Sequence, residues 1–353
     1  MLLALSALLA PLSALLAPRP LLLAPRPAPA CRGGVRMATQ VVTDIDDTIK
    51  SSGGLAIGSI PLGGVDTTYA RNAFYPGVFQ FGAELAGGGR RLPWGPPPPD
   101  VAVLTARAEE FRWALEIKQD SALCVRYADV GRALRWTDWG VGPILYGSVA
   151  EWVCQERKGW RKCENFKRLH AMNDARQRYV FVGDNGSSEK DLEAAELIAE
   201  AFPGLLRAVF LHAVSADQAR PPRSPAPFPA CGPPSTQSSG PPAQVPAPLP
   251  EDGSIGGAPL LYFRTYATAA AKAARAGLFG PAALDRILDA VEQDMAADGE
   301  NIPAGSANEA LLREEIDAAR RVGRPRNAVA NLVGGRWRRA MSEPAQLKGW
   351  FIR

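Results

Sequence analysis

Three aspartates stand within four residues of one another in the segment Val41-Val42-Thr43-Asp44-Ile45-Asp46-Asp47-Thr48. Carboxylates this close repel one another unless a cation joins them. A small cluster of oxygen ligands, without nitrogen or sulfur, favours Mg²⁺. The segment therefore predicts either a magnesium site or an acidic turn at the surface, since aspartate is also common in turns.

The spacing of Asp44 and Asp46 suits two complementary roles in phosphate chemistry. Side chains two residues apart on a strand point to the same side, so both carboxylates would face one reacting centre. Asp44 can then attack phosphorus as a nucleophile while Asp46 protonates the leaving oxygen. Thr48 would help to fix the turn that follows.

Two later segments carry polar groups that such a reaction uses. The apolar run Val101–Thr105 ends in the hydroxyl of Thr105, which can bond a phosphoryl oxygen. Lys158 and Lys162 precede an amphipathic helical pattern, and a lysine there can neutralise the phosphoryl charge. Taken singly, each feature also fits an ordinary strand end or a solvated helix start.

A further apolar run, YVFVG, leads into an acidic stretch. Asp184 follows this run directly and would complete a magnesium shell. Glu189 and Asp191 stand at the start of the next helical pattern. Carboxylates at helix N-termini are ordinarily caps, so these two have a structural alternative.

All of these residues stand at the ends of short apolar runs that alternate with helical patterns. Strands are expected at Thr39–Asp44, Val101–Thr105, Pro143–Tyr146, Tyr179–Gly183 and Leu206–Leu211, and helices at Gly77–Ala86, Ala108–Asp120, Cys163–Ala175 and Glu189–Ala201. This alternation predicts an α/β fold with a central parallel sheet and helices on both faces. In such sheets ligands bind beyond the carboxyl ends of the strands, where the candidate residues stand.

Composition divides the 353 residues into four segments. They are a presequence at 1–37, the α/β domain at 38–213, a proline-rich disordered linker at 214–258 and a helical C-terminal extension at 259–353. The presequence is apolar and free of acids, and its prolines argue against a transmembrane helix. It resembles a plastid transit peptide cleaved before Ala38. A secretory or mitochondrial signal and a mis-start upstream of Met37 are the alternatives.

Charge and histidine content exclude several classes of function. The chain has 40 basic and 36 acidic residues, and four of the basic ones are arginines of the presequence, so the remainder balances at 36 of each. A neutral body predicts no nucleic-acid partner. Only two histidines, His170 and His212, are present, which argues against a histidine-ligated metal and a Ser-His-Asp triad.

Taken together, these residues resemble the four motifs of the haloacid dehalogenase (HAD) phosphatase superfamily, in the same order. The first motif, DxDxT, corresponds to Asp44–Thr48, and the strand-end hydroxyl of the second corresponds to Thr105. The third-motif lysine corresponds to Lys162, and the fourth motif to Gly183-Asp184 with a later acid. The resemblance covers residues 38–213 and implies a HAD-like Rossmannoid three-layer sandwich.

Three runs resemble one family more closely, the actin-patch-associated phosphatidate phosphatases. They are DIDDTIKSSG, RKCENFKRL and FVGDNGSSEKD. This sequence departs from the family pattern by two additional residues, Ser187-Ser188, which place Asp191 seven positions after Asp184. Glu189 and Asp191 are therefore both candidates for the last acid. The run VLTAR also resembles the second motif of lipin-like relatives.

This resemblance implies a mechanism through an aspartyl-phosphate. Asp44 would be the nucleophile, Asp46 the acid and base, and Lys162 a neutralising charge, before water hydrolyses the intermediate. Mg²⁺ would be held by the side chains of Asp44, Asp184 and Asp191 and by the backbone carbonyl of Asp46.

The family also implies a lipid phosphomonoester substrate, phosphatidate, hydrolysed to diacylglycerol and phosphate. The stretches after Thr48 and between Ile117 and Lys162 leave room for a flap but for no large cap, and an open site agrees with a lipid. Two alternatives remain, a phosphatase for a soluble phosphometabolite or phosphoprotein, and a phosphatidate-binding module without turnover. The basic, aromatic tail up to Arg353 is either a peripheral membrane contact or a plain terminus.

Overall fold

The computed structural model describes residues 39–54, 56–57, 60–61, 64–89, 97–111, 116–150, 154–173, 176–186, 190–214 and 249–323. All of these belong to one compact unit, Met37–Arg353. The predicted presequence, most of the predicted linker and the basic, aromatic tail lie outside the described residues, so the expectations for them stay predictions.

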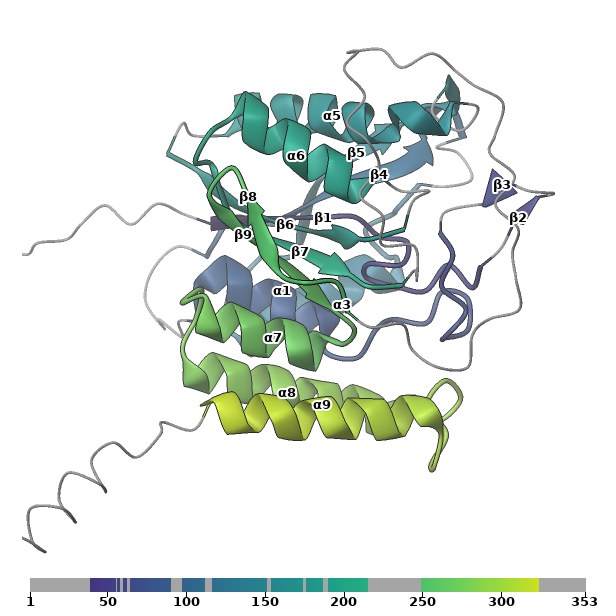
Figure 1. The fold of residues 1–353 in the computed structure, drawn as a ribbon, viewed down its shortest axis with the longest axis vertical. Coiled ribbons are helices and arrows are strands. Elements are labelled where there is room, and N and C mark those ends of the chain that lie inside the picture. Colours follow the sequence, from purple (N-terminus) through teal and green to yellow (C-terminus); the bar gives the residue numbers. More distant parts are fainter. Residues whose placement is uncertain are drawn as a thin grey trace, which may run out of the picture. The chain divides into compact units, whose positions relative to one another are not determined.

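A seven-stranded sheet runs through this unit in the order β5-β4-β1-β6-β7-β9-β8 (Figure 1). Its strands are β1 (Thr39–Thr43), β4 (Val101–Ala108), β5 (Val141–Gly147), β6 (Arg178–Asp184), β7 (Leu206–His212), β8 (Gly253–Ile255) and β9 (Ala258–Phe263). Neighbouring strands are parallel except β8 and β9, which are antiparallel. A separate hairpin of β2 (Ala56–Ile57) and β3 (Ile60–Pro61) lies at the end toward which β4 and β7 point.

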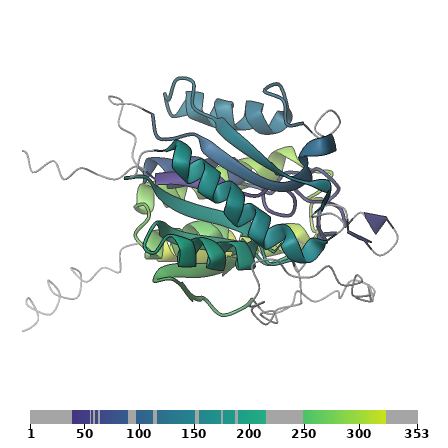
Figure 2. The ribbon, with the colours of Figure 1, turned by 90° about the horizontal axis from the view of Figure 1, so that it is seen from above.

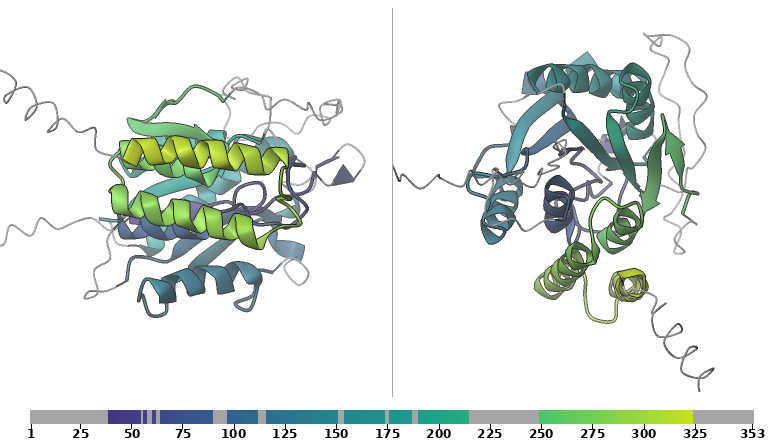
Figure 3. Two further views of the ribbon diagram at one scale, coloured as in Figure 1. Left: turned by 90° about the horizontal axis from the view of Figure 1, so that it is seen from below. Right: turned by 90° about the vertical axis from the view of Figure 1, so that its left-hand side faces the viewer.

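Helices cover both faces of the sheet, as Figures 2 and 3 show. One face packs against α5 (Lys158–Met172) and α6 (Asp191–Ala201). The other packs against α1 (Val78–Gly87), α3 (Ala122–Ala133), α7 (Tyr266–Arg275) and α8 (Pro281–Ala297), with α9 (Ala307–Gly323) against α7 and α8. Val180 and Phe181 are consecutive on β6 and enter opposite cores, which is why the central strands read as unbroken apolar runs. The predicted α/β fold with a mostly parallel, doubly covered sheet is confirmed.

The segment after the linker begins with strands, which corrects its predicted boundaries. Residues 253–258 were expected in the disordered linker and 259–263 in a helical extension, but they form β8 and β9. β9 pairs parallel with β7, with Leu260 opposite Val209. The apolar run from Ala258 to Phe263 extends the sheet beyond β7, β8 forms its edge, and α7 to α9 share the core of one face. The segment is therefore part of the α/β fold.

One predicted helix is also wrong. Residues 108–120 were expected to be helical, but β4 continues to Ala108, and the short 3₁₀ helix η1 (Glu109–Phe111) follows it. The helix of this region is α3, which begins after Ser121, whose side chain accepts a hydrogen bond from the N–H of Cys124 at 3.4 Å. A serine at position 121, a residue type that favours helix N-caps, was the sequence signal for the true start of this helix.

The connections that could have held a cap domain are occupied by elements of the fold itself. Between β1 and α1 the described residues contain the β2–β3 hairpin, and between Ile117 and Lys162 they contain α3 and β5, followed by the 3₁₀ helix η2 (Gln155–Arg157). In these described stretches no further domain is inserted. Within the part of the chain that the structure covers, no helix combines the length and apolarity needed to cross a membrane.

Candidate active site

Three adjacent strands end at one edge of the sheet and bring polar residues together there. β1 lies between β4 and β6, with Thr43 opposite Val103 on one side and Val182 on the other. Asp44 directly follows β1, and its N–H donates to the carbonyl oxygen of Val182 at 3.0 Å. Parallel register therefore places Asp44 and Asp184 at neighbouring strand ends, as the sequence predicts. Thr105 lies two residues beyond Val103, within β4 rather than at its end.

Three carboxylates form a compact buried group at this edge. Asp44, Asp184 and Asp191 each place a carboxylate oxygen within 4.8 Å of the others, and each residue is at most 1% exposed. Oxygen ligands at this spacing and burial can bind a metal ion. Without a cation, three like charges in a buried group would be strongly unfavourable.

Lys162 supplies one positive charge to this group. Its ammonium donates to Oδ2 of Asp44 at 3.1 Å and to Oδ1 of Asp191 at 2.5 Å, and the residue is 1% exposed. Lys158 lies four residues earlier and is also buried. Both lysines lie on α5, which begins at Lys158 rather than after Lys162. Lys162 thus contacts the predicted nucleophile.

Asp191 is the last acid that the structure places in the site. It begins α6, and its Oδ2 accepts the N–H of Asp184 at 3.1 Å. Glu189 lies outside the described residues. Asp184 in turn accepts the N–H of Gly186 on Oδ1 at 2.5 Å, which shapes the turn after β6. The Asp191 carboxylate therefore contacts the end of β6 at Asp184.

This close approach depends on Gly183. A Cβ atom at that position would lie 2.5 Å from Oδ2 of Asp191. We expect Gly183→Ala to push Asp191 away and to weaken divalent-cation binding about 10- to 100-fold, the usual cost of displacing a group that supports a metal site. Isothermal titration calorimetry measures this. Gly253→Ala is the matched control, because a Cβ there meets nothing within 4 Å; equal affinities of the two variants would contradict the prediction.

The carboxylate of Asp46 is engaged outside the three-carboxylate group. Arg107 donates to it with two nitrogens, Nε to Oδ2 at 3.1 Å and Nη2 to Oδ1 at 2.8 Å. A metal-ligand role for the Asp46 backbone carbonyl stays a prediction. The side chains of Asp44 and Asp46 thus have different partners, an ammonium and a guanidinium, although they were expected to face one centre.

Arg107 is a site residue whose role the motifs did not assign, although it is the last residue of VLTAR. Burial alone would lower its pKa, but the carboxylates of Asp46 and Asp44 together raise it. The Thr105 hydroxyl accepts the N–H of Arg107 at 3.2 Å, so Thr105 positions the arginine backbone. The sequence signal for Arg107 was a basic residue two positions after the candidate hydroxyl of Thr105.

Asp47 ties down the loop that follows the first motif. Its buried carboxylate accepts the N–H groups of Ser52 at 2.8 Å, Val65 at 2.5 Å and Asp66 at 2.9 Å. Its backbone is left-handed, with φ of 59°. Aspartate and asparagine tolerate this conformation best among residues with a Cβ. Asp47 is therefore a structural neighbour of the site.

We expect Asp47→Asn to lower the free energy of unfolding by about 1–3 kcal/mol, because an amide cannot accept all three N–H groups. Burial raises the pKa of Asp47 above 3.8, although the N–H groups of Ser52 and Asp66 oppose this. Urea unfolding of both proteins at neutral pH measures this difference, and equal free energies of unfolding would refute the assignment.

Two buried side chains outside the motifs, one on β7 and one on α7, contact the backbone of the first motif. The hydroxyl of Tyr266, on α7, donates to the carbonyl oxygen of Thr48 at 2.7 Å. Nδ1 of His212 lies 2.7 Å from the carbonyl oxygen of Asp47. Both side chains are buried, and no pattern in the sequence pointed to either contact.

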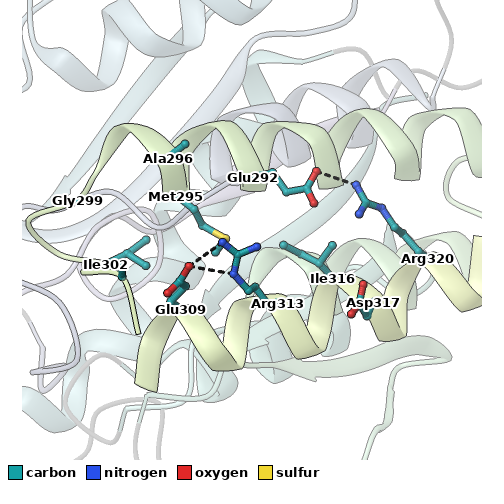
Figure 4. A pocket seen from close by; sticks show the side chains of 11 residues that line it. Glu292, Met295, Ala296, Gly299, Ile302, Glu309, Arg313, Ile316, Asp317 and Arg320 are labelled. Carbon is teal, nitrogen blue, oxygen red and sulfur yellow. Dashed lines mark hydrogen bonds and ion pairs between the residues drawn. The ribbon is translucent and has the colours of Figure 1, made fainter. Parts of the chain in front are cut away.

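A cavity of about 540 Å³ lies between α8 and α9, and none of the site residues lines it (Figure 4). Its arginines already pair with carboxylates: Arg313 with Glu309 at 2.7 Å, and Arg320 with Glu292 at 2.7 Å. We therefore assign no anion-binding role to this cavity.

No protein-family model matches the chain, and neither a curated protein nor a solved structure matches it. The class of protein is therefore defined by the fold and the site alone. It is an α/β protein whose parallel sheet carries, at the ends of adjacent strands, a buried group of three carboxylates that can bind a metal ion.

Proposed function

We propose that this protein is a Mg²⁺-dependent phosphatase with a HAD-like fold, acting on phosphatidate or a similar phosphomonoester. One observation carries the proposal: the Asp44 carboxylate accepts a hydrogen bond from the ammonium of Lys162 and lies within 4.8 Å of two further buried carboxylates. A cationic partner and an adjacent candidate metal site suit a nucleophile that attacks a dianion.

The donor set fits magnesium. Asp44, Asp184 and Asp191 offer only oxygen ligands, and their three negative charges exceed the single charge of Lys162. These three side chains would hold the ion, with the Asp46 carbonyl as a further ligand. When bound, Mg²⁺ would neutralise charge on the transferring phosphoryl group.

The residues of the chain would divide the remaining work. Asp44 attacks phosphorus and forms an aspartyl-phosphate, while Lys162 neutralises a phosphoryl oxygen. Asp46 delivers a proton to the leaving oxygen and then removes one from the attacking water. Arg107 holds Asp46 in place through its paired hydrogen bonds. Thr105 orients Arg107, and its hydroxyl would bond a phosphoryl oxygen.

Phosphate release is the direct test. We would measure it with Mg²⁺ and with EDTA on phosphatidate, sugar phosphates and nucleotides. Magnesium-dependent release from phosphatidate in preference to the others supports the proposal. Release from soluble substrates alone would favour a general phosphatase, and phosphatidate binding without release would favour a binding module.

Metal binding has its own readout. We expect Mg²⁺ to raise the melting temperature of the protein, because the ion relieves repulsion among three buried carboxylates. Asp184→Asn should melt higher than the unmodified protein without metal and should gain less on addition of Mg²⁺. Thermal unfolding with and without Mg²⁺ measures both changes. An unchanged response to Mg²⁺ in this variant would contradict the assignment of Asp184.

A further inference from the structure

The loop that follows the first motif returns toward α1 along residues 64–75, the return segment. This segment pairs with the chain just beyond the motif, because the N–H of Ser51 donates to the carbonyl oxygen of Ala73 at 2.9 Å. The carboxylate of Asp47 also accepts two N–H groups of the return segment, at 2.5 and 2.9 Å. The return segment is therefore in contact with the turn that carries Asp46.

The C-terminal helices contact the return segment as well. Oδ1 of Asn301, in the connection between α8 and α9, accepts the N–H of Ala70 at 3.0 Å. Nδ2 of Asn308, in the first turn of α9, donates to the carbonyl oxygen of Thr68 at 2.9 Å. One acceptor and one donor of the C-terminal segment thus hold two adjacent points of the return segment.

The side-chain amide of Asn301 is oriented by its own connection. Its Nδ2 donates to both carboxylate oxygens of Asp298, at 2.8 and 2.9 Å, and its backbone N–H donates to Oδ1 at 3.3 Å. With the nitrogen bound to Asp298, Oδ1 is the amide atom that faces the N–H of Ala70. An amide that is already oriented loses little side-chain freedom when it binds the loop, which favours the contact.

Apolar packing, rather than these asparagines, holds α8 and α9 in place. Leu284, Ile287 and Leu312 are each at most 1% exposed and belong to the core of this face. Both asparagine contacts with the return segment lie at the surface instead. Removing them should therefore release the loop and leave the packing of the helices intact.

We infer that Asn301 and Asn308 are positioning residues, which strap the return segment to the C-terminal helices and thereby fix the turn that carries Asp46. The route is short, because the return segment binds the Asp47 carboxylate and Asp47 directly follows Asp46. A loosened return segment would let the Asp46 carboxylate move relative to a phosphoryl group on Asp44, and proton transfer depends steeply on such distances. The catalytic part of this inference rests on the proposed function.

Hydrogen exchange tests the strap without turnover. In the double variant Asn301→Ala/Asn308→Ala, the backbone N–H groups of the return segment should exchange about tenfold faster than in the unmodified protein, since two hydrogen bonds no longer oppose local opening. Asn308→Asp keeps the shape of the side chain but loses the donor, and it should raise exchange as Asn308→Ala does. Asn308→Gln keeps a donor and should restore most of the protection.

Asn173→Ala is the matched control for the loss of a side-chain amide. Asn173 donates to Oε1 of Gln40 at 2.7 Å and to the hydroxyl of Tyr179 at 3.1 Å, and both residues lie at the amino-terminal ends of their strands, β1 and β6. The variant should lower the melting temperature but leave exchange in the return segment within about twofold of the unmodified protein.

Phosphate release tests the consequence for catalysis. The double variant should lower kcat about tenfold and leave KM within about twofold, because a misplaced catalytic group costs up to about 10²-fold while Lys162 and the three carboxylates stay in place. Asn173→Ala should leave kcat unchanged.

Faster exchange together with a lower kcat supports the strap. Unchanged exchange in the double variant would overturn it, as would faster exchange with an unchanged kcat, or an equal loss of kcat in Asn173→Ala. If the unmodified protein releases phosphate from none of the substrates, the proposed function fails, and the exchange result alone then supports or overturns the strap.

Discussion

Asp44→Asn is expected to reduce phosphate release about 10⁴-fold or more, the scale on which removal of a catalytic nucleophile acts. The amide has the shape of the carboxylate but cannot form the aspartyl-phosphate. It also keeps a hydrogen-bond acceptor for Lys162, which lies 3.1 Å from Oδ2. The fold should therefore survive, and the loss should fall on kcat. Steady-state phosphate release with Mg²⁺ measures the change.

Two controls make this result specific to Asp44. Asp129→Asn removes an exposed carboxylate of α3 that pairs with Arg132, and it should leave kcat unchanged. Incubation with a ³²P-labelled substrate should label the unmodified protein and not Asp44→Asn. Undiminished phosphate release by Asp44→Asn would rule out the mechanism.

Lys162→Met is expected to damage both activity and stability. Without its ammonium, Asp44 and Asp191 lose a shared buried partner, and breaking such a pair costs about 3–5 kcal/mol of unfolding free energy. Activity should fall about 10²- to 10³-fold, as when one group that stabilises transition-state charge is removed. Urea unfolding and phosphate release measure the two effects.

Addition of Mg²⁺ distinguishes the loss of stability from the loss of activity in Lys162→Met. Mg²⁺ should restore part of the stability of Lys162→Met, because it replaces positive charge among the carboxylates, while most of the activity stays lost. Lys167→Met changes a half-exposed lysine on the same helix and should alter stability by no more than about 0.5 kcal/mol. Equal metal-free stabilities of Lys162→Met and Lys167→Met would show that the buried ion pairs are not stabilising.

The site residues that follow apolar runs were predictable from local pattern. Asp44 follows β1 and Asp184 ends β6, and adjacent parallel strands must bring their carboxyl ends to one edge. Thr105 was expected to end its strand as well, but it lies within β4, which continues to Ala108. Lys162 and Asp191 were weaker predictions, each with a near alternative in Lys158 or Glu189. Which lysine and which acid reach the site depends on how α5 and α6 are rotated against the sheet. The sequence indicates this rotation only through its helical periodicity.

The missed elements have a different explanation. The strand after the linker, β9, pairs with β7, whose residues lie some fifty positions earlier in the chain. The proline-rich composition before β9 led to the prediction of a linker, and the alanines after β9 led to the prediction of a helix. The β4 strand overran its predicted end for a similar reason, since pairing with β5 continues to Ala108 opposite Gly147. Long-range pairing overrode local preference in both places.

By itself, the sequence determined the α/β class, the order of the candidate motifs and the chemistry of their side chains. These follow from local periodicity and from the residue types at strand ends. Only the tertiary structure decided that Asp46 pairs with Arg107, that Gly183 admits Asp191, and that Tyr266 holds Thr48. Such contacts join residues up to 218 positions apart. Their geometry depends on packing across the whole sheet, which no short stretch of sequence specifies.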